Sequence, residues 1–168
     1  IAGVLAGIKA KEAGADVTLV DKGTVGKSGL SPFFCTYQVF DDSTGVTKKQ
    51  YIETVSRSGE YLVNRDYFEM FAEDSKARYE ELIAWGAKEP SGKRGVNLRA
   101  QVEKRGVRLI ERTMVTDLLE KDGHVVGVAG FPMEQDKAVV ILARAVVLCS
   151  GSGAYKSPGW PISSLTHD

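Results

Sequence analysis

Apolar and polar side chains recur along the chain with two different periods, and together these periods predict an α/β domain. Small and apolar residues have helical spacing over residues 2–13, and Gly14 is the expected end of that helix. The same spacing predicts helices over residues 47–62 and 66–85. A shorter helix is expected over residues 98–104.

Runs of β-branched and apolar residues predict strands of two kinds. Residues 16–20 and 107–110 are short apolar runs, as in buried parallel strands. Residues 113–119, 124–131 and 138–142 are separated by turn sequences and predict an antiparallel meander. A last apolar run, residues 145–149, is expected to be a strand that leads into a glycine turn. This order indicates an α/β fold with a parallel sheet, a three-stranded antiparallel meander and a helical insertion.

Composition and charge exclude several classes of protein. The 168 residues suffice for one domain, and equal numbers of basic and acidic residues, 22 of each, leave no basic field for nucleic acid. The longest apolar stretch, residues 138–148, is too short to cross a bilayer, and no secretory signal is visible. The distant Cys35 and Cys149 indicate neither a metal site nor a disulfide framework, and Cys149 is expected in the core. The start at Ile1 within a helix and the end at Asp168 after a loop indicate a fragment.

The first candidate for chemistry is the pair Gly3 and Asp21. A dinucleotide fold needs a glycine turn that opens a helix, then a strand that ends in an acid roughly 20 residues later. Gly3 precedes a helix of small residues, and Asp21 follows the strand 18 positions later. Such an acid can hold ribose hydroxyls, but an acid after an apolar strand is also an ordinary solvated loop residue. Both interpretations remain open at this point.

The loop over residues 26–31 strengthens the first interpretation. Its glycines permit close approach of the backbone to a ligand, Lys27 is basic, and Ser28 and Ser31 can donate to phosphate oxygens. The alternative is an ordinary surface loop. The Pro-Phe-Phe run over residues 32–34 favours a buried turn.

Five segments carry a joint pattern: IAGVLAGIKAKEAGADVTLVDKGTVGKSGLSPF, LRAQVEKRGVRLIERTMVTDLL, GHVVGV, ARAVVLCSGSGA and LTHD. Together they resemble the flavoprotein subunits of the fumarate reductase and succinate dehydrogenase family, which includes L-aspartate oxidase and the adenylylsulfate reductase α-subunit. The resemblance implies a partial FAD-binding domain of the glutathione-reductase-like kind over residues 1–168. The first strand, the start of the phosphate turn and the capping substrate domain are expected to be missing.

The resemblance also implies which residues bind FAD. Asp21 matches the acid on the adenosine ribose, Ser28 the serine at the pyrophosphate, and Val115 a strand residue whose backbone meets adenine. Residues 150–152 match a turn beneath the dinucleotide, and Asp168 matches the acid of a Gly-Asp-Gly segment. The full implied set is Gly3, Asp21, Lys22, Lys27, Ser28, Gly29, Ser31, Val115, Ser150, Gly151, Ser152 and Asp168.

The chain departs from the family pattern at several positions. Gly29 stands where succinate-oxidising members have the histidine that is joined to the flavin, so non-covalent FAD is expected. Residues 32–35 replace an Ala-rich segment, the connection over residues 89–96 is short, and His167 replaces a glycine. The family's catalytic Arg and His lie beyond Asp168, so no catalytic residue and no metal ligand is assigned here.

The implied function is FAD-dependent oxidation or reduction of a small organic acid. An adenylylsulfate reductase-like or steroid dehydrogenase-like enzyme on the same scaffold stays an alternative, as does a flavin-binding module without catalysis. The fragment alone is expected to be inactive. The resemblance leaves open an iron–sulfur electron-transfer subunit as a partner. The protein is expected in the cytoplasm, with a peripheral position at the inner face of a membrane also open.

Overall fold

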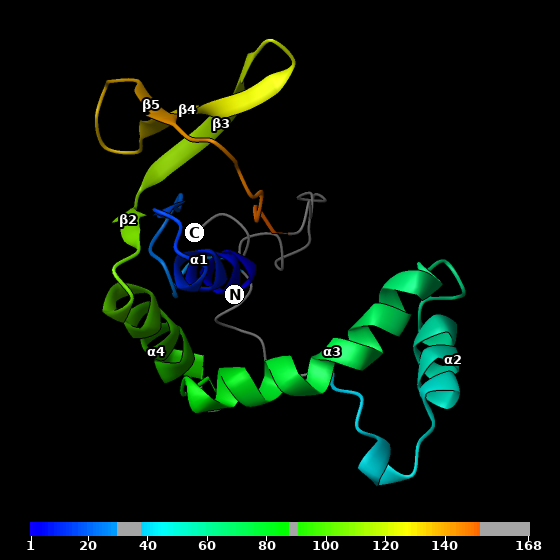
Figure 1. Ribbon diagram of the computed structural model, residues 1–168. Helices are drawn as coiled ribbons and strands as arrows, with labels where there is room; N and C mark the ends of the chain where they lie inside the picture. The colour runs from blue at the N-terminus through cyan, green and yellow to red at the C-terminus, as the bar shows by residue number, and fades with distance from the viewer. Residues whose placement is uncertain (30–37, 88–90, 152–168) are drawn as a thin grey trace, which may run out of the picture. The chain divides into compact units, whose positions relative to one another are not determined.

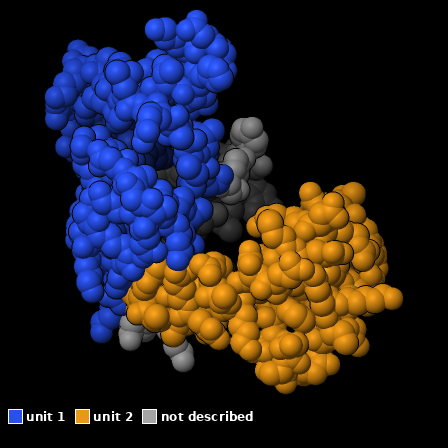
Figure 2. Space-filling view, in the orientation of Figure 1, with its two compact units in different colours: residues 1–34, 89–168 blue, residues 35–88 orange. Residues whose placement is uncertain are grey.

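The computed structural model of the chain describes residues 1–29, 38–87 and 91–151. The chain divides into two compact units, coloured separately in Figure 2. The first unit comprises Ile1–Phe34 and Glu89–Asp168, and the second comprises Cys35–Lys88. Figure 1 shows the order of their helices and strands. Within the described ranges, no helix is long and apolar enough to cross a membrane.

Helix α1 (Ala2–Glu12) confirms the first predicted helix. It ends because Gly14 takes a left-handed conformation, φ +88°, which glycine adopts without steric cost. The Gly14 N–H donates to the Lys11 carbonyl at 2.9 Å and thereby satisfies a carbonyl of the last turn. Val4 and Ile8 form the buried face of α1, and Ile8 is fully buried.

The predicted parallel strands are present and pair with each other. Strand β1 (Thr18–Val20) lies parallel to β2 (Arg108–Ile110), with Val20 opposite Ile110. Helix α4 (Ser91–Lys104) precedes β2 and packs against α1. Its Leu98 and Val102 are buried in the core of the unit. The chain therefore reaches the second strand through a helix, as a parallel pair requires.

Helix α4 begins at Ser91, whereas the sequence predicted a helix only from residue 98. The extra turns contain Gly92 and Gly95, which are poor helix formers and conceal the helix in the sequence. Packing explains the helix at Gly95, because its backbone contacts the backbone of Gly26 in the loop after β1.

The predicted meander is confirmed as a separate antiparallel sheet. It is formed by β3 (Thr113–Lys121), β4 (His124–Pro132) and β5 (Val139–Leu142). Asp122 and Gly123 connect the first two strands with φ values of 53° and 75°. Positive φ at both central residues matches the twist of a two-residue hairpin. The parallel pair, the meander and the helical insertion agree with the predicted fold class.

The strand expected over residues 145–149 is absent, and this prediction was wrong. These residues have no assigned secondary structure, and Val147, Leu148 and Cys149 are exposed. An apolar run becomes a strand only beside another strand that accepts its hydrogen bonds. No described strand pairs with this run. The expected core position of Cys149 was wrong for the same reason.

The second unit contains the two long helices that the sequence predicted. Helix α2 (Lys48–Ser58) starts with a capping box, in which Thr47 and Gln50 each bond the other's backbone N–H. Helix α3 (Arg65–Ala84) is capped by the preceding Asn64, whose side chain accepts from the Tyr67 N–H at 3.2 Å. Buried residues on both helices, Ile52 on α2 and Ala72 on α3 among them, form the apolar contact between them.

Asp41 ties a short 3-10 turn, η2 (Asp42–Thr44), to α3. Its carboxylate accepts from the Ser43 N–H at 3.0 Å and forms an ion pair with Lys76 at 3.0 Å. Hydrogen bonds from Ser43 and then from the Lys76 ammonium lower the pKa of Asp41 to about 2. Asp41 therefore stays charged in the folded protein far into the acid range.

Candidate functional site

The candidate site begins where β1 ends, at Asp21. The Asp21 N–H donates to the Ile110 carbonyl at 2.9 Å, and the Asp21 carbonyl accepts from the Thr113 N–H at 3.1 Å. Two residues later, the Gly23 carbonyl accepts from the Arg112 N–H at 2.9 Å. The backbone that carries Asp21 is thus held on both sides by the chain around β2 and β3.

The Asp21 carboxylate faces the following loop and meets Ser28 there. The Ser28 hydroxyl lies 2.7 and 2.9 Å from the two carboxylate oxygens, and the Gly23 N–H donates to Oδ1 at 2.8 Å. The loop itself is a tight turn, because the Lys27 and Ser28 N–H groups both donate to the Thr24 carbonyl, at 2.9 and 3.0 Å. Two predicted site residues, Asp21 and Ser28, are therefore direct neighbours.

The start of α1 lies close to Asp21 as well. The backbone nitrogen of Ile1 lies within electrostatic range of both Asp21 and Cys149. A Cβ placed on Gly3 would lie 3.5 Å from the Cβ of Cys149. The segment that leads to Ser150 thus runs close to Gly3. Three parts of the chain that the sequence singled out converge here.

The remaining predicted site residues have varied positions. Lys22 is half-buried directly after Asp21, Lys27 is exposed, and Gly29 has a left-handed φ of +69°. Ser150 and Gly151 are exposed, at the end of the described chain. Val115 is half-buried on β3, opposite Gly130 and beside a β-bulge. The other three predicted residues, Ser31, Ser152 and Asp168, lie outside the described residues, as do residues 32–35 and His167.

One acidic residue that the sequence analysis passed over also lies here. Glu111 follows β2 as Asp21 follows β1, and the register of the parallel pair makes the two residues neighbours. The Glu111 carboxylate accepts from the Val25 N–H at 2.7 Å and binds the guanidinium of Arg99 on α4. The signal was present in the sequence, since each of two short apolar strands is followed by an acid.

The chemistry of these groups fits the adenosine half of a dinucleotide. A carboxylate at the end of a parallel strand can accept hydrogen bonds from two ribose hydroxyls. The N–H groups at the start of a helix, together with a serine hydroxyl and a lysine, suit a pyrophosphate. Among the described residues, no group of three or more His, Cys, Asp or Glu side chains could hold a metal ion.

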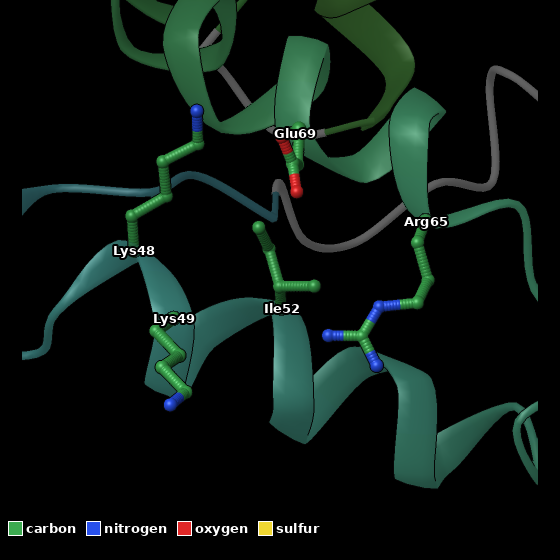
Figure 3. Close-up of a pocket in the computed structure, with 5 residues that line it drawn as sticks. All are labelled: Lys48, Lys49, Ile52, Arg65 and Glu69. Atoms are coloured by element: carbon green, nitrogen blue, oxygen red, sulfur yellow. The ribbon is translucent and has the colours of Figure 1, made fainter.

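A pocket in the second unit carries none of these residues. Figure 3 shows its lining, which consists of Lys48, Lys49, Ile52, Arg65 and Glu69. The ammonium of Lys48 pairs with Glu73 at 2.6 Å. Glu69 and Glu73 thus offset two of the three positive charges, and the pocket has little net charge for an anionic ligand.

The comparison with protein families identifies one family. The model of the FAD binding domain family matches residues 1–99. No curated protein matches the chain in sequence.

Three solved structures show the fold. A mutant of E. coli quinol fumarate reductase FrdA has a TM-score of 0.77 at 20% identity over 89% of this chain and 31% of its own. Mycobacterium smegmatis Sdh1 in complex with UQ1 has a TM-score of 0.72 at 21% identity over 89% of this chain and 32% of its own. The Rhodococcus jostii RHA1 3-ketosteroid-delta4-(5alpha)-dehydrogenase, in complex with 4-androstene-3,17-dione, has a TM-score of 0.59 at 20% identity. That match covers 86% of this chain and 42% of the dehydrogenase chain. The chain thus spans about a third of the first two structures.

Proposed function

Since this chain belongs to the FAD binding domain family, we propose that it is the cofactor-binding part of an FAD-dependent oxidoreductase that acts on a small organic acid. The observation that carries the proposal is the cluster of Asp21, Ser28 and the start of α1 at the end of β1. Bound FAD supplies two-electron redox chemistry, and the protein positions and tunes the cofactor.

The proposed roles of the residues follow from their positions. Asp21 accepts hydrogen bonds from the hydroxyls of the adenosine ribose, in competition with its present partner Ser28. Ser28 and Lys27, with the N–H groups at the start of α1, bind the pyrophosphate. Gly3 permits the backbone of the helix start to approach the ligand closely. Lys22, Gly29, Val115 and the Ser150–Gly151 turn, together with Ser31, Ser152 and Asp168, complete the proposed set.

The proposed substrate class and partners rest on structural likeness. The fumarate reductase and succinate dehydrogenase structures resemble this chain more closely, with TM-scores of 0.77 and 0.72, than the steroid dehydrogenase does at 0.59. We therefore favour a small organic acid over a steroid. An iron–sulfur electron-transfer subunit is the proposed partner, and the proposed location is the cytoplasm or the inner face of a membrane.

The site assignment is tested by flavin affinity. Asp21→Ala removes a charged acceptor of hydrogen bonds, which is worth roughly 1.5–3 kcal/mol, so the dissociation constant of FAD should rise at least about tenfold. Asp16→Ala is the matched control, because Asp16 precedes the same strand but its side chain is 83% exposed. Titration of each apoprotein with FAD gives the constants. Equal affinities of the two variants would contradict the assignment.

The substrate class is tested by reoxidation of the flavin. The intact holoprotein is reduced without oxygen, then mixed separately with fumarate, adenylylsulfate and 4-androstene-3,17-dione. Recovery of the absorption of oxidised flavin with fumarate alone is the expected result. Recovery with adenylylsulfate or the steroid alone would replace the proposed substrate class with that of the corresponding enzyme.

A further inference from the structure

The loop that carries Ser28 is fixed to helix α4 by two backbones in direct contact. Gly26 has a left-handed φ of +84°, and a Cβ on either Gly26 or Gly95 would overlap the backbone of the other residue. Only two glycines allow this approach. Val25, next to Gly26, has an exposed fraction of 2%. The first half of the loop is therefore buried against α4.

Glu111 holds the same loop through a second contact. Its Oε1 atom accepts from the Val25 N–H at 2.7 Å and from Nη1 of Arg99. Its Oε2 atom accepts from Nη2 of Arg99 at 3.0 Å, so the arginine binds both oxygens. Arg99 is itself oriented by Glu103, which accepts from Nε at 2.9 Å.

The charge of this carboxylate is stabilised by its partners. The Arg99 guanidinium, and to a smaller degree the Val25 N–H, lower the pKa of Glu111, while burial acts in the opposite direction. The hydrogen bond from Arg99 to Glu111 likewise raises the pKa of Arg99. A bidentate pair with an arginine fixes a carboxylate in orientation as well as charge.

We propose that Glu111, oriented by Arg99, is a positioning residue that sets the Thr24–Ser28 turn for the adenosine half of FAD. The inference rests on the proposed function of Asp21 and Ser28. Val25 is the second residue of this turn, and the Thr24 carbonyl closes it by accepting from the Ser28 N–H at 3.0 Å. Because the turn is tight, a shift of Val25 moves Ser28 away from Asp21. Glu111 thus acts on the cofactor through the loop and does not touch it.

An ion pair of the residue that directly follows α4 supplies a control. Nε of Arg105 donates to Glu12 of α1 at 2.8 Å, and Nη1 of Arg105 donates to the side chain of Gln101 at 2.7 Å. Arg105→Gln removes an arginine–glutamate ion pair at the end of the same segment. A purely structural role for Glu111 would make variants of both pairs behave alike.

The test measures the dissociation constants of FAD and ADP with apoprotein of the full chain. ADP serves as the second probe because it shares the adenosine ribose and the pyrophosphate with FAD. Glu111→Leu removes the acceptor of the Val25 N–H and should weaken both ligands by about tenfold or more. Glu111→Gln keeps an oxygen acceptor and should recover most of this loss. Arg105→Gln should bind both ligands as the wild type does.

The outcomes separate this inference from the proposed function. Normal binding by the wild type with unchanged affinities in Glu111→Leu would overturn the inference alone. Equal losses of affinity in Glu111→Leu and Arg105→Gln would also overturn the inference, since they would show that any loss of stability weakens ligand binding. Should Glu111→Leu fail to fold, Arg99→Gln takes its place. We expect this variant to bind both FAD and ADP more weakly, and unchanged affinities would overturn the inference. A wild type that binds neither FAD nor ADP would overturn the proposed function as well.

Discussion

Replacement of Gly95 by alanine tests the contact between α4 and the loop after β1. Alanine normally stabilises a helix interior by about 0.5–1 kcal/mol relative to glycine, because glycine loses more conformational freedom on folding. At Gly95 the added Cβ would overlap the carbonyl of Gly26. To remove this overlap, the backbone of Gly95 or of Gly26 must move, and such overpacking costs about 1–3 kcal/mol.

Gly7 in α1 allows the same change without overlap. A Cβ on Gly7 would lie 3.7 Å from Cδ1 of Leu19 and 3.9 Å from Cγ1 of Val107, which are ordinary contact distances. Gly7→Ala should therefore raise the free energy of unfolding. The gain from helix propensity is common to both variants, so the difference between them isolates the overlap at Gly95. We expect Gly95→Ala to be less stable than Gly7→Ala by about 1–3 kcal/mol.

Urea unfolding of the two apoproteins, followed by circular dichroism, measures this difference. FAD titration of the folded variants adds a second readout, because displacement of Gly26 also displaces Ser28. Gly95→Ala should bind FAD more weakly, and Gly7→Ala should bind it like the wild type. A Gly95→Ala protein as stable as Gly7→Ala, with unchanged FAD affinity, would refute the contact and its proposed effect on the loop.

Three further predictions concern other parts of the chain. The pKa of Asp41 is about 2 in the folded protein against an ordinary 3.8, so the charged Asp41 side chain stabilises the folded protein near neutral pH, and this stabilisation is lost as the pH falls from about 4 to 2. Asp41→Asn should reduce the fall in the thermal unfolding temperature over this pH range, and an unchanged pH profile would contradict the prediction. Gly123→Ala forces alanine to a φ of 75° and should lower the free energy of unfolding by about 1–2 kcal/mol; equal stability in urea would count against the turn. Acid precipitation of the holoprotein should release the flavin, because Gly29 offers no side chain for a covalent bond; flavin retained in the washed pellet would show otherwise.

Local patterns in the sequence were sufficient for much of the first unit and for both helices of the second. The αL glycine after α1 and the Asp-Gly hairpin between β3 and β4 were predicted because each depends on a few adjacent residues. The position of Asp21 at the end of β1 was predicted because such an acid has a defined spacing from the glycine turn, here 18 positions from Gly3.

The errors and omissions depend on contacts between distant residues. The start of α4 is concealed by glycines that serve the contact with Gly26 and not the helix itself. The run over residues 145–149 has strand composition, but no described strand pairs with it. Glu111 and Arg99 are separated by 12 positions, and only the parallel pairing of β1 and β2 brings them to the loop at Val25. Such relations are properties of the fold and are not visible in local composition.

The central claim is that the cluster at Asp21 binds the adenosine half of FAD. The most direct measurement is the identity of the flavin that the purified intact protein carries. Heat releases a non-covalently bound flavin, and chromatography separates FAD from FMN, which lacks the adenosine that Asp21 is proposed to bind. We predict FAD as the released cofactor, and release of FMN alone would contradict the claim.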